Sequence, residues 1–495
     1  MSSPAPVRFP EAAERVPSRI SAVVFAAKAW VLRAHRGVRN LRNPVRRHTS
    51  KEVILPVQVA EVLTPLWTTE SLVEQSLQLG KVQNLRVAAR RLDGVIVPAG
   101  QTFSFWCQLG RATLRKGYVS GRELREGCLI PAIGGGLCQL SNALYDAALQ
   151  SGCEIVERHA HSRIVPGSAA EFGRDATVAW NYVDLRFRPP HDIRMQVQLG
   201  PQELRVRFLA AQTINPSASR AAMPGLLPRL LNPIAHTCTD CGVTDCIRHI
   251  DPQAPRIAKT AYLLDECWPE FLAYVGERVS AEDFAIAPAL FGRYRSVRAL
   301  GVKARPHSTS IPALWRAIRM RAASTVPRRV QAQLAGSEHI AEAMARSLPY
   351  DAIHLVVAQT LLPFLWKAGA LGGRTFDVLM TRIPLARLHS LLDDASARNP
   401  ELKTLREYRA PQAIIDAEQE ALAAAQRVVT PHDAIAALFG ERAIRKPWSM
   451  PRVARVQRGR TVVFPGPTVA RKGALAPAFR SACTRLRSDD SRAQP

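Results

Sequence analysis

The sequence has few cysteines, few acidic residues and no long apolar run. Nine cysteines among 495 residues are too few for a disulfide scaffold, and three of them cluster at a metal-like spacing, which favours a reducing compartment. The apolar stretch from Ile20 to Leu32 has thirteen residues, including Lys28. It is too short to span a bilayer and lacks the cleavage site of a signal peptide. We therefore expect a cytoplasmic protein in which this stretch is a short helix, with a membrane-peripheral basic amphipathic helix as the alternative.

Acidic residues are outnumbered, with 41 Asp and Glu against 67 Lys and Arg, for a net charge of +26. The excess lies at the ends: residues 1–50 carry ten basic and two acidic residues, and residues 442–495 carry thirteen and two. A positive balance favours nucleic acid, anionic lipid or phosphorylated partners. Because such charged ends are usually solvated tails, we do not expect nucleic acid as a partner, while an anionic surface stays open.

The length allows roughly three domains of ordinary size. An apolar content of 47% and a charged content of 22% are those of a globular protein that buries several cores. Composition and patterning divide the chain into a basic N-terminal segment (1–50), a first domain (51–212), a linker (213–235), a second α/β region (236–475) and a disordered basic tail (476–495).

Apolar periodicity predicts the fold class. The stretch from Ile193 to Phe208 alternates on both sides of Gly200, which predicts an antiparallel hairpin with one buried face. The run "AIHLVVA", residues 352–358, predicts a buried strand among helical segments. We therefore expect an α/β protein: an α+β domain with antiparallel strands and a cysteine-bearing helix, followed by a Rossmann-like α/β region.

The stretch "GGGLCQLSNALYDAAL" leads three glycines into Cys138 at the start of a predicted amphipathic helix. The inward face is expected to comprise Leu137, Leu140, Leu144 and Ala148. A neighbouring polar face that could line a cleft comprises Cys138, Ser141, Asn142 and Tyr145. Backbone N–H groups at a helix start favour negative charge. They should lower the pKa of the Cys138 thiol and could form an oxyanion hole.

A nucleophilic cysteine needs a base and a group that orients the base. The segment "ERHAHSR" supplies His159 and His161, and Asp175 and Asp184 are the available carboxylates. A cysteine at a helix start followed by a histidine and an aspartate is the order of papain-like and transglutaminase-like sites, an analogy of arrangement only. The alternative is structural, because cysteines are often buried and glycines can mark only a close backbone approach.

Five blocks in this order resemble the VanW-like family over about residues 40–210: "VPAGQTFSFWCQLG", "KGY", "GGGLCQLSNALY", "ERHAHS" and "DATVAWNYVDLRF". The family is named from glycopeptide-resistance gene clusters. The resemblance therefore implies a cell-wall- or glycoconjugate-related protein that binds a polar or glycan-related small molecule. The positions matching the family pattern are Gly134, Gly135, Gly136, Cys138, Gln139, His161, Asp175 and Asp184.

These matches define two sets of candidate residues. The candidate catalytic residues are Cys138, His161, Asp175 and Asp184. In the same cleft the candidate substrate-binding residues are Gly135, Gly136 and Gln139. In the "FSFW" block, Phe103, Phe105 and Trp106 are expected in the core or in the cleft wall.

The stretch "HTCTDCGVTDCIRH" has the spacing of a metal site. It places Cys238, Cys241, Cys246 and His249 as C-x2-C-x4-C-x2-H, which suits a structural, tetrahedral zinc ion. His236 could replace His249, and an iron–sulfur cluster is a second option. The alternative is a set of reduced cysteines without a metal.

Residues 236–475 also resemble the acceptor lobe of GT-B glycosyltransferase-like proteins, through "AEQEALAAAQRVVTPHDAIAALFG" and "VVFPGPTVARKGA". The resemblance places Arg471 and Lys472 where a lobe that binds the diphosphate of a nucleotide-sugar would begin. Only twenty-two residues follow Gly473, and a donor lobe needs several βα units of about thirty residues each. We therefore expect neither a nucleotide-sugar nor sugar transfer on this chain alone.

Three functions follow from these patterns. The first is a protein with a Cys138-dependent acyl-transfer or hydrolase-type site acting on a polar conjugate. The second is a glycosyltransferase-related protein with an incomplete donor lobe and an accessory first domain. The third is a basic scaffold for nucleic acid or an anionic membrane, whose binding should fall steeply with salt.

Overall fold

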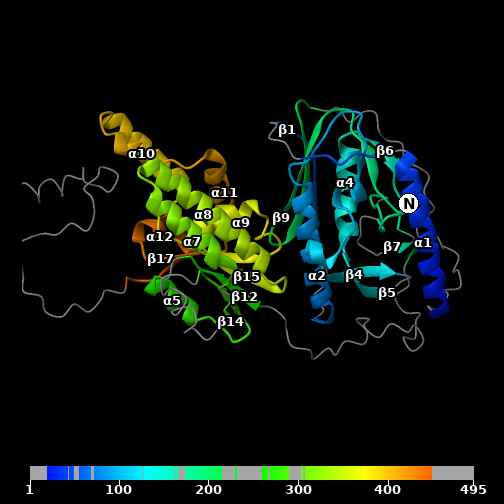
Figure 1. The fold of residues 1–495 in the computed structure, drawn as a ribbon, viewed down its shortest axis with the longest axis horizontal. Helices are drawn as coiled ribbons and strands as arrows, with labels where there is room; N and C mark the ends of the chain where they lie inside the picture. Colours follow the sequence, from blue (N-terminus) through cyan, green and yellow to red (C-terminus); the bar gives the residue numbers. More distant parts are fainter. Residues whose placement is uncertain are drawn as a thin grey trace, which may run out of the picture. The chain divides into compact units, whose positions relative to one another are not determined.

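A computed structural model describes residues 19–42, 44–49, 55–67, 72–125, 128–161, 163–164, 173–213, 229–230, 259–265, 268–288, 303–304 and 307–448. The chain forms two compact units. The first comprises Met1–Ala258, Pro349–Ile353 and Leu371–Arg374, and the second comprises Lys259–Leu348, His354–Ala370 and Thr375–Pro495. Figure 1 shows the helices and strands of both.

The first unit is built on antiparallel strands. Its largest sheet has the order β1-β10-β9-β2, with β1 at Val57–Pro65, β10 at Glu203–Ala210, β9 at Ile193–Leu199 and β2 at Ile96–Val97. A second sheet has the order β3-β8-β6, at Phe103–Ser104, Arg186–Arg188 and Glu154–Glu157. Strands β4 (Ser120–Arg125) and β5 (Cys128–Ile133) form a hairpin, and β7 (Arg163–Ile164) pairs in parallel with β11 (Arg229–Leu230).

The predicted hairpin is confirmed by β9 and β10, which pair antiparallel around a short turn. Along both strands buried residues alternate with more exposed ones, as expected when one face of a sheet packs on a core. The helices among the described residues of this unit are α1 (Arg19–Arg42), α2 (Leu72–Leu92), α3 (Phe105–Leu109) and α4 (Leu137–Gln150).

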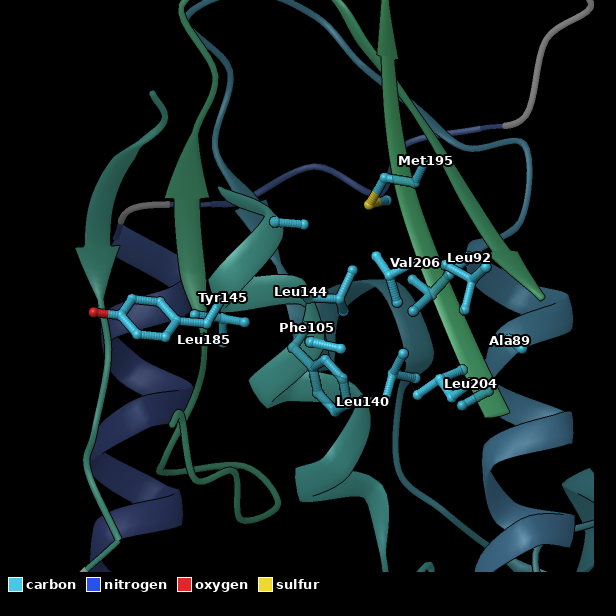
Figure 2. Packing of buried hydrophobic residues seen from close by; sticks show 14 of the residues in the cluster. Ala89, Leu92, Phe105, Leu140, Leu144, Tyr145, Leu185, Met195, Leu204 and Val206 are labelled. Atoms are coloured by element: carbon cyan, nitrogen blue, oxygen red, sulfur yellow. The ribbon is translucent and has the colours of Figure 1, made fainter. Parts of the chain in front are cut away.

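Helix α4 supplies one side of the core. Figure 2 shows Leu140 and Leu144 of α4 facing Leu204 and Val206 of β10. The four residues predicted for the inward face of this helix are all buried, which confirms that prediction. The aromatic side chains of the "FSFW" block are buried in the same cluster: Phe103, Phe105 and Trp106.

The second unit contains a seven-stranded sheet in the order β14-β13-β12-β15-β16-β17-β18. The pairs β12–β13, β13–β14, β15–β16, β16–β17 and β17–β18 are parallel. The strands are β12 (Lys259–Leu263), β13 (Phe284–Ile286), β14 (Lys303–Ala304), β15 (Ala352–Ala358), β16 (Thr375–Leu379), β17 (Arg427–Thr430) and β18 (Ala443–Arg445). The run predicted as a buried strand is β15.

Among the described residues, helices follow most of these strands along the chain. They are α5 (Pro269–Gly276), α7 (His307–Ala322), α8 (Val326–Ser347), α9 (Leu362–Lys367), α10 (Leu385–Arg398), α11 (Gln412–Ala424) and α12 (Asp433–Phe439). Phe271 and Tyr274 of α5 share a core cluster with Val356, Leu379 and Val429 of the sheet. The expected mixed α/β class is thus confirmed, with antiparallel sheets first and a parallel sheet after them. The likeness of the second unit to a glycosyltransferase lobe stays a prediction.

Candidate functional site

The glycine turn before α4 has a geometry that only glycine accepts. Gly134 and Gly136 have φ angles of 83° and 95°, in the left-handed region that side chains disfavour. Gly135 packs so closely that a Cβ there would lie 2.3 Å from the carbonyl oxygen of Gly121. A Cβ at Gly136 would lie 2.2 Å from Cγ of Lys81. The protein's own packing therefore explains Gly135 and Gly136 without a bound substrate.

Polar contacts hold this turn and the helix start in place. The Asn84 amide donates to the carbonyl oxygens of Val119 (3.0 Å) and Gly135 (2.9 Å). Gln139, predicted to bind substrate, donates from Nε2 to the Thr64 hydroxyl (2.9 Å) and to the Pro65 carbonyl (2.8 Å). Gln139 therefore fastens α4 to the end of β1.

Cys138 is the second residue of α4 and its thiol is partly buried. Its Sγ lies 3.8 Å from Oγ1 of Thr177 and 3.9 Å from the carbonyl oxygen of Val178. The imidazole of His161 is close enough to the thiol to shift its pKa. On its other side, Nδ1 of His161 lies 2.8 Å from Oδ2 of Asp175. The structure thus brings Cys138, His161 and Asp175 into one group.

The protonation states of this group are coupled. Burial alone would raise the pKa of the Cys138 thiol, but the hydrogen bond and charge of His161 lower it below its ordinary value. Burial would lower the pKa of His161, whereas hydrogen bonds with Asp175 and Cys138 raise it to about 9. Both shifts favour a thiolate beside an imidazolium ion.

Asp175 is buried and held on both carboxylate oxygens. Its Oδ2 also accepts from the backbone N–H of His161 (2.6 Å), and its Oδ1 accepts from Nη2 of Arg158 (2.6 Å). Burial raises the pKa of this carboxyl, but the bonds with His161 and the charge of Arg158 lower it below its ordinary value. Arg158 was not among the predicted residues. Its guanidinium also lies over the Tyr145 ring, 5.3 Å from the ring centroid.

Two residues of the predicted polar face of α4 bond to the segment that carries Asp175. The Ser141 hydroxyl donates to the Ala176 carbonyl (2.5 Å), and Oδ1 of Asn142 accepts from the Ala176 N–H (2.8 Å). Tyr145 is buried and points away from Leu204 and Val206 (Figure 2). Ser141 and Asn142 therefore position the Asp175 segment, and the full burial of Ser141 corrects the expectation that it lines a cleft.

The structure does not bring Asp184 to this group. Its Oδ2 accepts from the Ser104 hydroxyl (2.6 Å) and from Nε of Arg186 (2.8 Å), and its Oδ1 accepts from the Trp106 N–H (3.1 Å). Asp184 therefore stabilises the start of α3. His159, the other histidine of this segment, has its Nε2 3.1 Å from Oε1 of Glu157.

Two predicted sites lie outside the described residues. They are the metal ligands Cys238, Cys241, Cys246 and His249, and the basic pair Arg471 and Lys472. Within the stretches that the structure describes, no group of three or more His, Cys, Asp or Glu side chains could hold a metal ion. Over the same stretches, no helix has both the length and the apolar character needed to cross a membrane.

Sequence comparison matches residues 80–209 to the family described as VanW like protein. The uncharacterized protein YoaR of Bacillus subtilis (strain 168) is 40% identical over 105 residues, which is 21% of this chain and 34% of YoaR. The vancomycin B-type resistance protein VanW of Enterococcus faecalis (strain ATCC 700802 / V583) is 32% identical over 154 residues, 30% of this chain and 55% of that protein. The chain thus spans about a third to a half of the length of these distant relatives.

Proposed function

We propose that the VanW-like domain at residues 80–209 is a cysteine-dependent acyltransferase or hydrolase. Cys138 is the nucleophile, His161 transfers the proton and Asp175 orients His161. The observation that carries this proposal is the 2.8 Å contact between Nδ1 of His161 and Asp175, on an imidazole that also lowers the pKa of the Cys138 thiol. A merely structural cysteine would not require a charged, carboxylate-bound imidazole beside its sulfur.

In the proposed reaction, the Cys138 thiolate attacks the carbonyl carbon of an ester or amide. His161 gives its proton to the departing alcohol or amine as the bond to that group breaks, leaving a thioester on Cys138. Water or an acceptor amine then attacks the thioester and loses a proton to His161, and the thiolate departs. The Cys138 N–H lies in the first helical turn, where no intrahelical acceptor exists, and can stabilise the oxyanion.

The substrate class rests on the comparisons. The Enterococcus relative is called a vancomycin B-type resistance protein, and we infer from this that the acyl group belongs to a polar, cell-wall- or glycan-related conjugate.

Thiol reactivity tests the proposal directly. Near pH 7, we expect iodoacetamide to alkylate Cys138 at least about tenfold faster than Cys153, as measured by peptide mapping. Cys153 is the internal control, because burial raises the pKa of its thiol to about 11. His161→Ala should remove most of the advantage of Cys138, and Asp175→Asn should remove part of it. Equal rates at Cys138 and Cys153, or no effect of His161→Ala, would contradict the thiolate–imidazolium pair.

A second measurement tests the acyl transfer itself. An activated aryl ester should release a burst of phenol equal to the amount of protein and leave an acyl group on the Cys138 peptide. Cys138→Ser should abolish both the burst and the adduct, whereas Cys153→Ser should preserve them. A reactive Cys138 that never carries the acyl group would show a reactive thiol without acyl-transfer chemistry.

A further inference from the structure

Helix α1 contacts the first unit through its polar side. The Arg36 guanidinium forms an ion pair with Glu157, with Nη1 2.8 Å from Oε2. Nε of Arg33 donates to the Trp180 carbonyl (2.7 Å). Because Arg33 and Arg36 are three residues apart, they lie on one face of the helix. That face is turned towards the rest of the unit, and Figure 1 shows α1 at its edge.

The opposite face of α1 is apolar and exposed. Leu41 is 84% exposed, and Val23 and Trp30 are each 69% exposed. At 100° per residue, the apolar residues of this face fall within about 120° of the circumference: Val23, Val24, Ala27, Trp30, Val31, Ala34, Val38 and Leu41. The stripe runs for about 27 Å. A surface helix ordinarily buries such a stripe against the rest of the protein. Here the described residues leave the apolar face of α1 uncovered.

A cationic edge accompanies the stripe. Lys28, His35, Arg39 and Arg42 are exposed and follow one side of it, and the helix contains no acidic residue. None of these four forms an ion pair with another residue that the structure describes. An apolar face with a Trp, bordered by Lys and Arg, matches the interface of an anionic bilayer, where apolar groups enter the acyl boundary and cations meet phosphates. A nucleic acid would use the cations but would gain nothing from the apolar stripe.

We propose that α1 binds anionic lipid surfaces as an in-plane helix and holds the VanW-like domain against them. The inward ion pair with Glu157 orients the helix so that its apolar face points away from the protein. The proposed lipid binding is independent of the Cys138 chemistry, because Glu157, which holds α1 in place, makes no contact with the thiol in the described structure.

Co-sedimentation of the full chain with vesicles tests this inference. We expect binding to vesicles of phosphatidylcholine with 30% phosphatidylglycerol to exceed binding to pure phosphatidylcholine by about tenfold or more. Raising the salt concentration should weaken the binding. The double substitution Trp30→Asp with Val38→Asp should reduce it at least about tenfold, since two charges then enter the apolar boundary.

A matched control uses exposed apolar residues elsewhere. Ile311 and Leu314 of α7 are 78% and 47% exposed, and Ile311→Asp with Leu314→Asp should leave vesicle binding unchanged. Unchanged thermal unfolding of each double variant shows that the protein still folds. The inference is overturned if anionic vesicles are not bound, or if both double variants bind them equally. It is also overturned if Trp30→Asp with Val38→Asp dissociates a dimer in light scattering, because a second copy would then cover the face.

Discussion

Helices α1 and α4 of the first unit use their apolar faces in opposite ways. Leu140 and Leu144 of α4 are fully buried against the sheet, and the polar side of that helix holds the segment of Asp175. Helix α1 exposes Trp30 and turns Arg36 inward to Glu157. The comparison shows that periodicity assigns residues to a face, while the available partners determine which face is buried.

The largest expected effect concerns the buried face of α4. Leu144→Ala should lower the free energy of unfolding by about 2–5 kcal/mol, because it removes apolar contacts and leaves a cavity. Urea denaturation followed by circular dichroism measures this loss. A loss below about 1 kcal/mol would mean that this helix is not packed as the structure shows.

The second largest effect is expected at the ion pair that orients α1. Glu157→Gln should lower the local stability of residues 19–42 by about 1–3 kcal/mol, since it removes a charged hydrogen-bond partner of Arg36. Hydrogen–deuterium exchange should then speed up in α1 and stay slow in α4. The pKa of Glu157 is lowered to about 2 by hydrogen bonds with His159 and Arg36, against the opposing effect of burial. The same loosening should therefore appear progressively in the wild type as the pH falls from about 4.5, the ordinary value of a glutamate, towards 2.

His161, which shifts the pKa of Cys138 at the start of α4, gives a smaller, pH-dependent effect. Its folded pKa of about 9 is above the unfolded value of about 6.5. Its stabilising contribution is therefore fully present below pH 6.5 and is lost as the pH rises through 9. The difference in unfolding free energy between the wild type and His161→Ala should shrink between pH 6 and pH 9.5. A difference that grows over this range would contradict the protonated pair.

The smallest effect is expected on the exposed face of α1. Val31→Ala should change the free energy of unfolding by less than about 0.5 kcal/mol, because the side chain is already in water. The same urea experiment as for Leu144→Ala makes the comparison direct. A cost above about 1.5 kcal/mol would show that this face is covered in solution.

Much of the candidate site could be shortlisted from local patterns. The glycine run places Cys138 at a helix start, and the nearby histidines are few, so Cys138 and His161 follow from the sequence. The sequence offers no reason to prefer Asp175 over Asp184 as the group that orients His161, since both follow His161 at a short distance along the chain. Arg158 was missed although it lies inside the "ERHAHS" block, because its role depends on Asp175 seventeen residues away.

The sequence alone determined those elements of the fold whose pattern repeats between residues that are near one another in the chain. Alternating residues define the β9–β10 hairpin, a continuous apolar run defines β15, and helical spacing defines the inward face of α4, because strand and helix periods act between neighbours along the chain. Only the tertiary structure decided which carboxylate meets His161 and which face of α1 is buried. Arg36 and Glu157 are 121 residues apart, and no local pattern encodes a pairing over that distance. The pairing depends on where the sheet places each side chain and on whether each buried charge has an oppositely charged partner there.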